Sequence, residues 1–159
     1  MFISELLISQ SPNIPLEFNR KPRTLTEAKR WKATEFRQFL FYTGSVVLKN
    51  KLNTNRYLNF LTLHVASTIL SNSKHSDYID YASSLFKYFI DTFITLYGSE
   101  NVSNNIHNLL QISQDVKNLG PLNNFSAFEN YLQSLLKLIR KGGKPLSQII
   151  RRKSEQDHF

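Results

Sequence analysis

The fold is decided by the stretch Ser76-Asp-Tyr-Ile-Asp-Tyr-Ala-Ser-Ser-Leu-Phe-Lys-Tyr-Phe-Ile-Asp-Thr-Phe-Ile-Thr-Leu-Tyr97. Its apolar and aromatic residues recur every three or four positions, which is the spacing of one face of an α-helix. The residues on this face are Tyr78, Ala82, Leu85, Phe86, Phe89, Ile90, Phe93, Ile94 and Tyr97. A face this wide and aromatic predicts the central helix of a bundle, ended by Gly98, which can adopt a positive φ.

Further helices are predicted on both sides of this stretch. Helical spacing of apolar residues indicates helices over about 25–42, 53–70, 102–119, 123–140 and 145–152. Three prolines, at positions 12, 15 and 22, exclude a continuous helix over residues 1–23 and predict an extended leader with a short helical start. The sequence therefore predicts an all-α fold, a single-domain bundle of about five to six helices with a short extended N-terminal leader. Its parts are the leader (1–23), a helical domain (24–153) and a frayed tail (154–159).

Local signals set the expected helix ends and special residues. Thr24-Leu-Thr-Glu27 is typical of a capping box that starts a helix at about residue 25. Gly44 predicts a kink or a break after that helix. Trp31 is expected to be a core anchor, with stacking on a nucleobase as the alternative.

Two helices on either side of the central one have predicted buried faces. In the helix over 53–70, the predicted face is Tyr57, Phe60, Leu61, His64, Val65, Thr68 and Ile69. Within it, His64 is expected to be a hydrogen-bonded core imidazole. In the helix over 102–119, the predicted face is Ile106, Leu109, Leu110, Ile112, Val116 and Leu119.

The chain is strongly basic, with 20 Lys and Arg against 12 Asp and Glu and a formal net charge of +8. The basic residues gather between positions 20 and 51 and between positions 137 and 153. Such clusters favour an acidic partner, nucleic acid first, although a solvated surface is the alternative. The candidate nucleic-acid-binding residues are Arg20, Lys21, Arg23, Lys29, Arg30, Lys32, Arg37, Lys137, Arg140, Lys141, Lys144, Arg151, Arg152 and Lys153.

Composition also restricts the kinds of site and the location. The chain has no Cys, which excludes disulfides, thiolate nucleophiles and Cys-based metal sites. No run approaches the roughly 20 apolar residues that span a bilayer, so we expect an intracellular protein without a membrane partner. The basic clusters 140–141 and 151–153 resemble a bipartite nuclear import signal, which favours the nucleus, while a solvated or phosphate-contacting face is the alternative.

Few residues are candidates for chemistry. Asn105 and His107 are expected to form a buried polar network, or to polarise a substrate. Glu129 completes Ser126-x-x-Glu129, which is explained by a capping box. Its competing role, as a metal-binding carboxylate, needs another carboxylate, for which Asp115 is the best candidate. No metal or cofactor site is predicted from spacing alone.

Several blocks of the sequence, over roughly residues 17–152, resemble one family. The blocks are Arg23-Thr-Leu-Thr-Glu-Ala-Lys-Arg-Trp-Lys-Ala-Thr-Glu-Phe-Arg-Gln-Phe-Leu-Phe-Tyr-Thr-Gly44, Leu96-Tyr-Gly98, Asn105-Ile-His-Asn-Leu-Leu110, Gly120-Pro-Leu122, Ser126-Ala-Phe-Glu-Asn130 and Gln148-Ile-Ile-Arg-Arg152. Their order and spacing resemble the downstream part of transposase-derived proteins of the CACTA (En/Spm-like) kind.

The resemblance implies an ancestral site. In such transposases a preceding ribonuclease-H-like core supplies aspartates that bind metal ions for DNA cleavage, and Glu129 then corresponds to the third acidic residue. One glutamate cannot hold two metal ions, and this chain begins shortly before the resemblance, so we expect no independent nuclease activity. Mg²⁺ is expected only as a cofactor of a complete transposase.

The expected function is therefore a non-catalytic, transposase-derived helical module, a truncated or domesticated piece of a mobile-element protein. Its expected partner is DNA or another protein, which includes a second copy of the chain. The alternatives are a sequence-independent nucleic-acid-binding protein, and the C-terminal part of a metal-dependent transposase that contributes Glu129.

Overall fold

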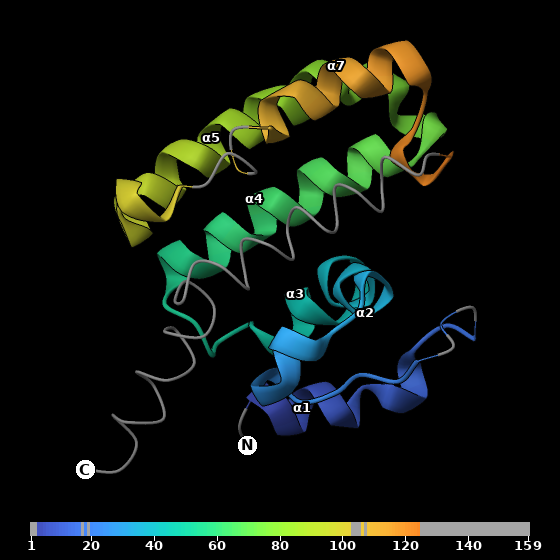
Figure 1. The fold of residues 1–159 in the computed structure, drawn as a ribbon, viewed down its shortest axis with the longest axis vertical. Helices are drawn as coiled ribbons and strands as arrows, with labels where there is room; N and C mark the ends of the chain where they lie inside the picture. The colour runs from blue at the N-terminus through green and yellow to red at the C-terminus, as the bar shows by residue number, and fades with distance from the viewer. Residues whose placement is uncertain (1–2, 17, 19, 103–105, 107, 125–159) are drawn as a thin grey trace.

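The computed structural model describes residues 3–16, 18, 20–102, 106 and 108–124, and these residues form an all-α fold (Figure 1). Its α-helices are α1 (Ile3–Ser9), α2 (Ala33–Gln38), α3 (Gly44–Val47), α4 (Thr54–Ser71), α5 (Ile79–Tyr97) and α7 (Leu109–Leu119). A π-helix, η3 (Phe39–Thr43), joins α2 to α3. The shorter 3-10 turns are η1 (Ser11–Asn13), η2 (Leu25–Arg30), η4 (Ser73–Tyr78), η5 (Ser99–Asn101) and η6 (Leu122–Asn124). The predicted helices over 123–140 and 145–152 and the predicted frayed tail lie mainly or wholly outside the described residues.

Helix α4 lies in the middle of the arrangement. Figure 1 shows α5 and α7 on one side of it and α1, α2 and α3 on the other, and α5 contacts both α4 and α7. The core follows this division. One cluster lies between α4, α5 and α7, and a second one joins Leu7 of α1 to Trp31, Phe36 and Val47.

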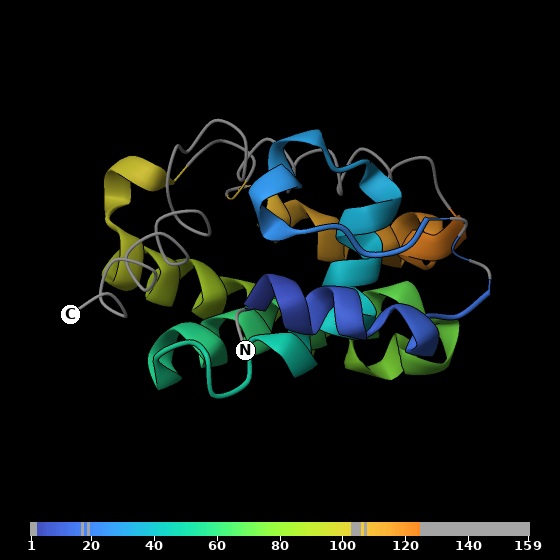
Figure 2. The ribbon, with the colours of Figure 1, turned by 90° about the horizontal axis from the view of Figure 1, so that it is seen from below.

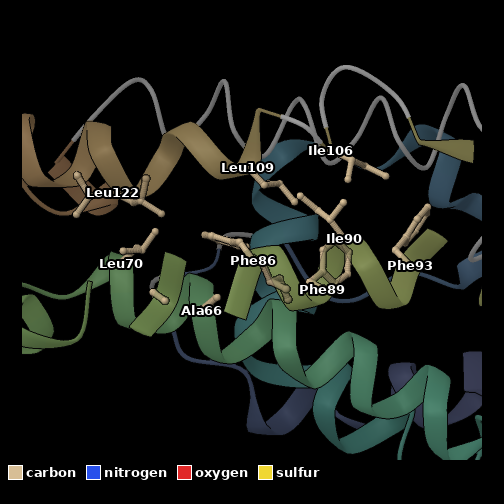
Figure 3. Packing of buried hydrophobic residues seen from close by; sticks show 12 residues of the cluster. Ala66, Leu70, Phe86, Phe89, Ile90, Phe93, Ile106, Leu109 and Leu122 are labelled. Carbon is tan, nitrogen blue, oxygen red and sulfur yellow. The ribbon is translucent and has the colours of Figure 1, made fainter. Parts of the chain in front are cut away.

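Helix α5 buries the wide aromatic face that its periodicity predicts, but α4 and not α5 is the middle helix of the arrangement. Phe86, Phe89, Ile90 and Phe93 are buried, and Figure 3 shows them between the residues of α4 and α7. The prediction is wrong at Tyr78, which is exposed, because α5 begins one residue later and Tyr78 belongs to η4. Ile94, at the edge of the face, is also partly exposed. Gly98 ends α5 with φ of 89°, as predicted.

The predicted buried face of α4 is confirmed in part, because Tyr57, Phe60 and Ile69 pack against the two core clusters. Val65 and Thr68 are exposed, whereas Asn59, Ala66 and Ser67 are buried. Helix α4 packs against α5 through Ala66 and Leu70 and also through a buried polar residue. The buried Asn59 amide donates to Phe89 O (3.0 Å) and to Thr92 Oγ1 (2.7 Å), so a polar side chain stabilises this helix contact.

The other side of α4 faces η3, and here the prediction for His64 is confirmed. His64 is half-buried, and its Nδ1 lies 2.7 Å from Leu40 O. A carbonyl can only accept, so Nδ1 carries the proton in this contact. Phe60 packs beside it against Phe39, with ring centroids 5.8 Å apart.

Helix α7 is shorter and buries a narrower face than predicted. It begins at Leu109, and Leu110 and Leu119 are exposed while Leu109 and Val116 are buried. Its buried residues, Leu109, Ser113 and Val116, recur at helical spacing on one face, and α7 contacts α5. Asn105 and His107, the predicted polar network, lie outside the described residues.

The first predicted helix is interrupted. Thr24 does not cap a helix with its side chain, and its hydroxyl instead lies 2.7 Å from the Thr26 hydroxyl. Turn η2 follows, and the backbone is extended at Trp31 and Lys32 before α2 begins. The break turns Trp31 into the core, where its ring lies near the rings of Phe36 and Phe39 at 5.0 and 5.6 Å. Trp31 is therefore the predicted core anchor, and its burial excludes nucleobase stacking.

The predicted break in the helix at Gly44 is not found. Its φ of −61° is helical, and the π-helix runs through it into α3. The glycine is needed for space instead. A Cβ here would lie 2.5 Å from Phe60 Cζ and 2.6 Å from Phe39 O.

Gly44→Ala is expected to lower the free energy of unfolding by about 1–3 kcal/mol, because an extra methyl group must displace packed atoms, one of them in the backbone. Urea denaturation followed by circular dichroism measures the change. The neighbouring Ser45→Ala is the matched control and should shift stability by less than about 0.5 kcal/mol. Equal stability of the two variants would contradict the close approach.

Candidate nucleic-acid interface

The positive charge of the described chain is concentrated in one place. Residues 20–37, called here the basic segment, contain seven Lys and Arg and two Glu, whereas residues 38–124 contain six Lys and Arg and five Asp and Glu. Figure 2 shows η2 and α2, which belong to this segment, on one flank of the molecule and α4 on the other. The candidate interface is therefore a local surface and not the molecule as a whole.

An ion pair between Arg23 and Glu35 organises the basic segment. Arg23 Nε donates to Glu35 Oε1 at 2.6 Å, and Arg23 Nη2 donates to Glu35 Oε2 at 2.9 Å. The same Nη2 donates to Arg30 O at 2.9 Å. Glu35 Oε2 also accepts from the backbone N–H of Lys32 at 2.7 Å, which caps α2. One pair of side chains thus connects the leader, the end of η2 and the start of α2.

The leader runs antiparallel to α2 and η3 and meets them at successive positions. Arg23 pairs with Glu35, and the Gln38 side chain donates to Arg20 O at 3.2 Å. One turn further, the rings of Phe18 and Tyr42 meet edge to face, with centroids 5.3 Å apart. These interactions fix the course of the leader beside the helix.

The electrostatics of the pair keep both groups charged. Glu35 is only 4% exposed. Burial raises the pKa of its carboxyl, but the hydrogen bonds from Arg23 and from Lys32 N–H, together with the charges of Arg23 and Arg20, outweigh burial and leave this pKa below its ordinary value. The hydrogen bond to Glu35 correspondingly raises the pKa of Arg23.

The other predicted basic residues differ in what they contact. Arg20, Lys21, Arg30 and Lys32 have exposed side chains. Arg37 is half-buried and donates to Asn123 Oδ1 at 3.0 Å, and Lys29 lies in η2. The remaining predicted site residues lie outside the described residues: Glu129, Lys137, Arg140, Lys141, Lys144, Arg151, Arg152 and Lys153.

Sequence reasoning missed the role of Glu35 and Gln38. A signal was present, because a carboxylate stands in the same helical stripe as Trp31 and Phe39, where a charge needs a partner. Arg23 is the partner, twelve residues earlier.

Glu35→Gln is expected to lower the free energy of unfolding at pH 7 by about 1–3 kcal/mol, because the charged hydrogen bonds to a buried carboxylate are removed. The folded-state pKa of Glu35 lies below its unfolded value of about 4.3, so this stabilisation is present above that pH and is lost as the pH falls through the folded-state pKa. The wild type and the variant should therefore converge in stability on acidification, as measured by urea denaturation between neutral and acid pH.

The control for this prediction is Asp91→Asn, which neutralises an exposed carboxylate on α5. It should change stability at pH 7 by less than about 0.5 kcal/mol. A stability difference between wild type and Glu35→Gln that stays constant with pH would contradict the ion-pair account.

No protein-family model, curated protein or solved structure matches this chain. Among the described residues, none of the helices is both long and apolar enough to cross a membrane. The same part of the chain holds no group of three or more His, Asp and Glu residues placed to bind a metal ion.

Proposed function

We propose that this chain is a helical module that binds nucleic acid through the phosphate backbone, without reading the base sequence. The observation that carries the proposal is the placement of Arg20, Lys21, Arg30 and Lys32, whose side chains are exposed on the leader, η2 and the start of α2, the segments that the Arg23–Glu35 pair joins. Cations on a backbone that is already fixed lose less conformational freedom when they bind phosphate. Their release of counterions from the polymer supplies the affinity.

The chemistry of these four side chains explains why no sequence preference is proposed. Lysine and arginine at an exposed surface contact phosphate oxygens, which are the same at every nucleotide. Sequence reading in a duplex needs an element that enters a groove and presents side chains to base edges. The basic segment consists of the leader, the turn η2 and the short helix α2, and its exposed polar groups are mainly cations.

The resemblance to CACTA-like transposases supports DNA as the polymer and a mobile-element origin for the module. In this proposal the module contributes binding and does not itself cleave DNA. Purified protein with Mg²⁺ should leave supercoiled DNA intact. Cleavage that disappears in Glu129→Gln would overturn the non-catalytic part of the proposal and leave the binding part standing.

The binding part is tested by fluorescence anisotropy with a labelled DNA duplex of arbitrary sequence over a range of salt concentrations. If the four exposed cations each bind one phosphate, the plot of log affinity against log salt concentration should have a slope of about −3 to −4. Duplexes of different sequence should bind equally. Absence of binding at low salt, or an affinity that does not depend on salt, would overturn the proposal.

A further inference from the structure

An exposed aromatic side chain stands at the end of the basic segment. Tyr42 is 43% exposed, although it packs against Phe18. The two rings meet edge to face and are inclined by 74°. A large part of Tyr42 therefore reaches solvent beside the leader.

Tyr42 lies close to the cations of the proposed interface. Gln38, which holds the Arg20 carbonyl, precedes Tyr42 by one helical turn, about 5.4 Å along the axis. On the leader, Phe18 and Arg20 are two residues apart, which is at most about 7 Å between Cα atoms. The leader therefore brings the backbone of Arg20 close to that of Tyr42, and the exposed Lys21 follows Arg20 in the chain.

The backbone that carries Tyr42 is unusual and well supported. Tyr42 lies in the π-helix η3, and π-helical turns are rare and frequent at functional sites. The turn is held by the contact of His64 Nδ1 with Leu40 O and by the close packing of Gly44 on Phe60. The tyrosine is therefore presented from a fixed position, which reduces the entropy lost when a ligand stacks on it.

Cations beside an exposed aromatic ring favour the binding of single-stranded over double-stranded nucleic acid. In a duplex the base faces are stacked on one another, whereas a single strand offers them to protein side chains. We infer that Tyr42 stacks on an unpaired base while Arg20 and Lys21 contact the neighbouring phosphates, so that the module prefers single-stranded nucleic acid. This inference rests on the proposed function, because it uses the same cations.

The test compares an oligothymidine of about 16 nucleotides with a duplex of the same length. Tyr42→Leu keeps an apolar contact for Phe18 but removes the aromatic face, and it should weaken binding of the oligothymidine about tenfold. Binding of the duplex should change by less than about twofold, and the salt slope should stay the same, because no cation is removed. Tyr42→Phe, which keeps the ring, should bind the oligothymidine like the wild type.

The matched control is Tyr81→Leu, since Tyr81 is 56% exposed on α5, outside the basic segment. Equal oligothymidine binding by Tyr42→Leu and Tyr81→Leu would overturn the inference while the proposed function stands. Failure of the wild type to bind either polymer would overturn the proposed function itself.

The wild-type protein provides a second test, which does not depend on a variant. Photo-crosslinking to a bromodeoxyuridine oligonucleotide should give an adduct at Tyr42, and adducts only elsewhere would contradict stacking.

Discussion

Replacing Lys21, Arg30 and Lys32 together by glutamine is expected to weaken binding of duplex DNA between about 100-fold and 1,000-fold at 0.1 M salt. All three side chains are exposed in the basic segment. Each cation that binds a phosphate contributes about −0.9 to the slope of log affinity against log salt concentration. Removing three such cations changes the slope by about 2.7, which corresponds to about 500-fold in affinity over the tenfold range from 1 M to 0.1 M salt. Anisotropy titrations of wild type and variant measure the difference.

The matched control removes the same charge from elsewhere on the molecule. Lys49, Lys74 and Lys87 are also exposed, and they lie after η3 in the described chain. If binding is local to the basic segment, their replacement by glutamine should lower affinity by less than about tenfold, through the general field of the protein alone. An equal reduction in both triple variants would show that net charge, and not the arrangement around Arg23 and Glu35, determines binding.

Phe86→Ala is expected to lower the free energy of unfolding by about 3–5 kcal/mol. Phe86 is fully buried, and it lies in the cluster that joins α4, α5 and α7. Removing its ring leaves a cavity that the surrounding helices close only in part. For a domain whose total stability is about 5–15 kcal/mol, this change is a large fraction, and urea denaturation measures it.

Tyr88→Ala is the control on the same helix, since Tyr88 is 57% exposed and two residues away. It should cost less than about 1 kcal/mol, because alanine favours the helix and the exposed ring adds little packing. Comparable destabilisation by the two variants would contradict the assignment of one buried face to α5.

Helix α5 and its buried face could be predicted, because their determinants are local. Phe86, Phe89 and Phe93 fall on one face at helical spacing, and the hydrophobic effect buries that face whatever the neighbouring elements are. The helix end at Gly98 could be predicted for the same reason, since glycine has no Cβ and adopts a positive φ at no steric cost. Both features follow from a single segment of the sequence.

The buried face of α4 could be predicted only in part, because it depends on two neighbouring elements. A pattern of apolar residues gives one face, whereas α4 contacts α5 on one side and η3 on the other. The buried residues of α4 include the polar Ser67 and Asn59, and the Asn59 amide donates to Phe89 O of α5. Their burial follows from tertiary structure and not from hydrophobicity.

The charged residues of the candidate site could be predicted from the sequence, but their contacts with one another could not. Composition identifies the cations of the basic segment, but the pairing of Arg23 with Glu35 joins residues from separate elements. Thr24 and Glu27 form a plausible local capping box, yet the carboxylate that caps a helix is Glu35, in the next element. The π-helix that presents Tyr42 also has no local signal, because it forms where η3 packs on α4.

The salt dependence of binding, compared between the wild type and the Lys21, Arg30 and Lys32 triple glutamine variant, tests the central claim most directly. The account predicts that the slope of log affinity against log salt concentration becomes about 2.7 less negative in the variant, with an equal share for each of the three cations removed. An identical slope in the two proteins would contradict the account, because the basic segment would then not bind the phosphate backbone.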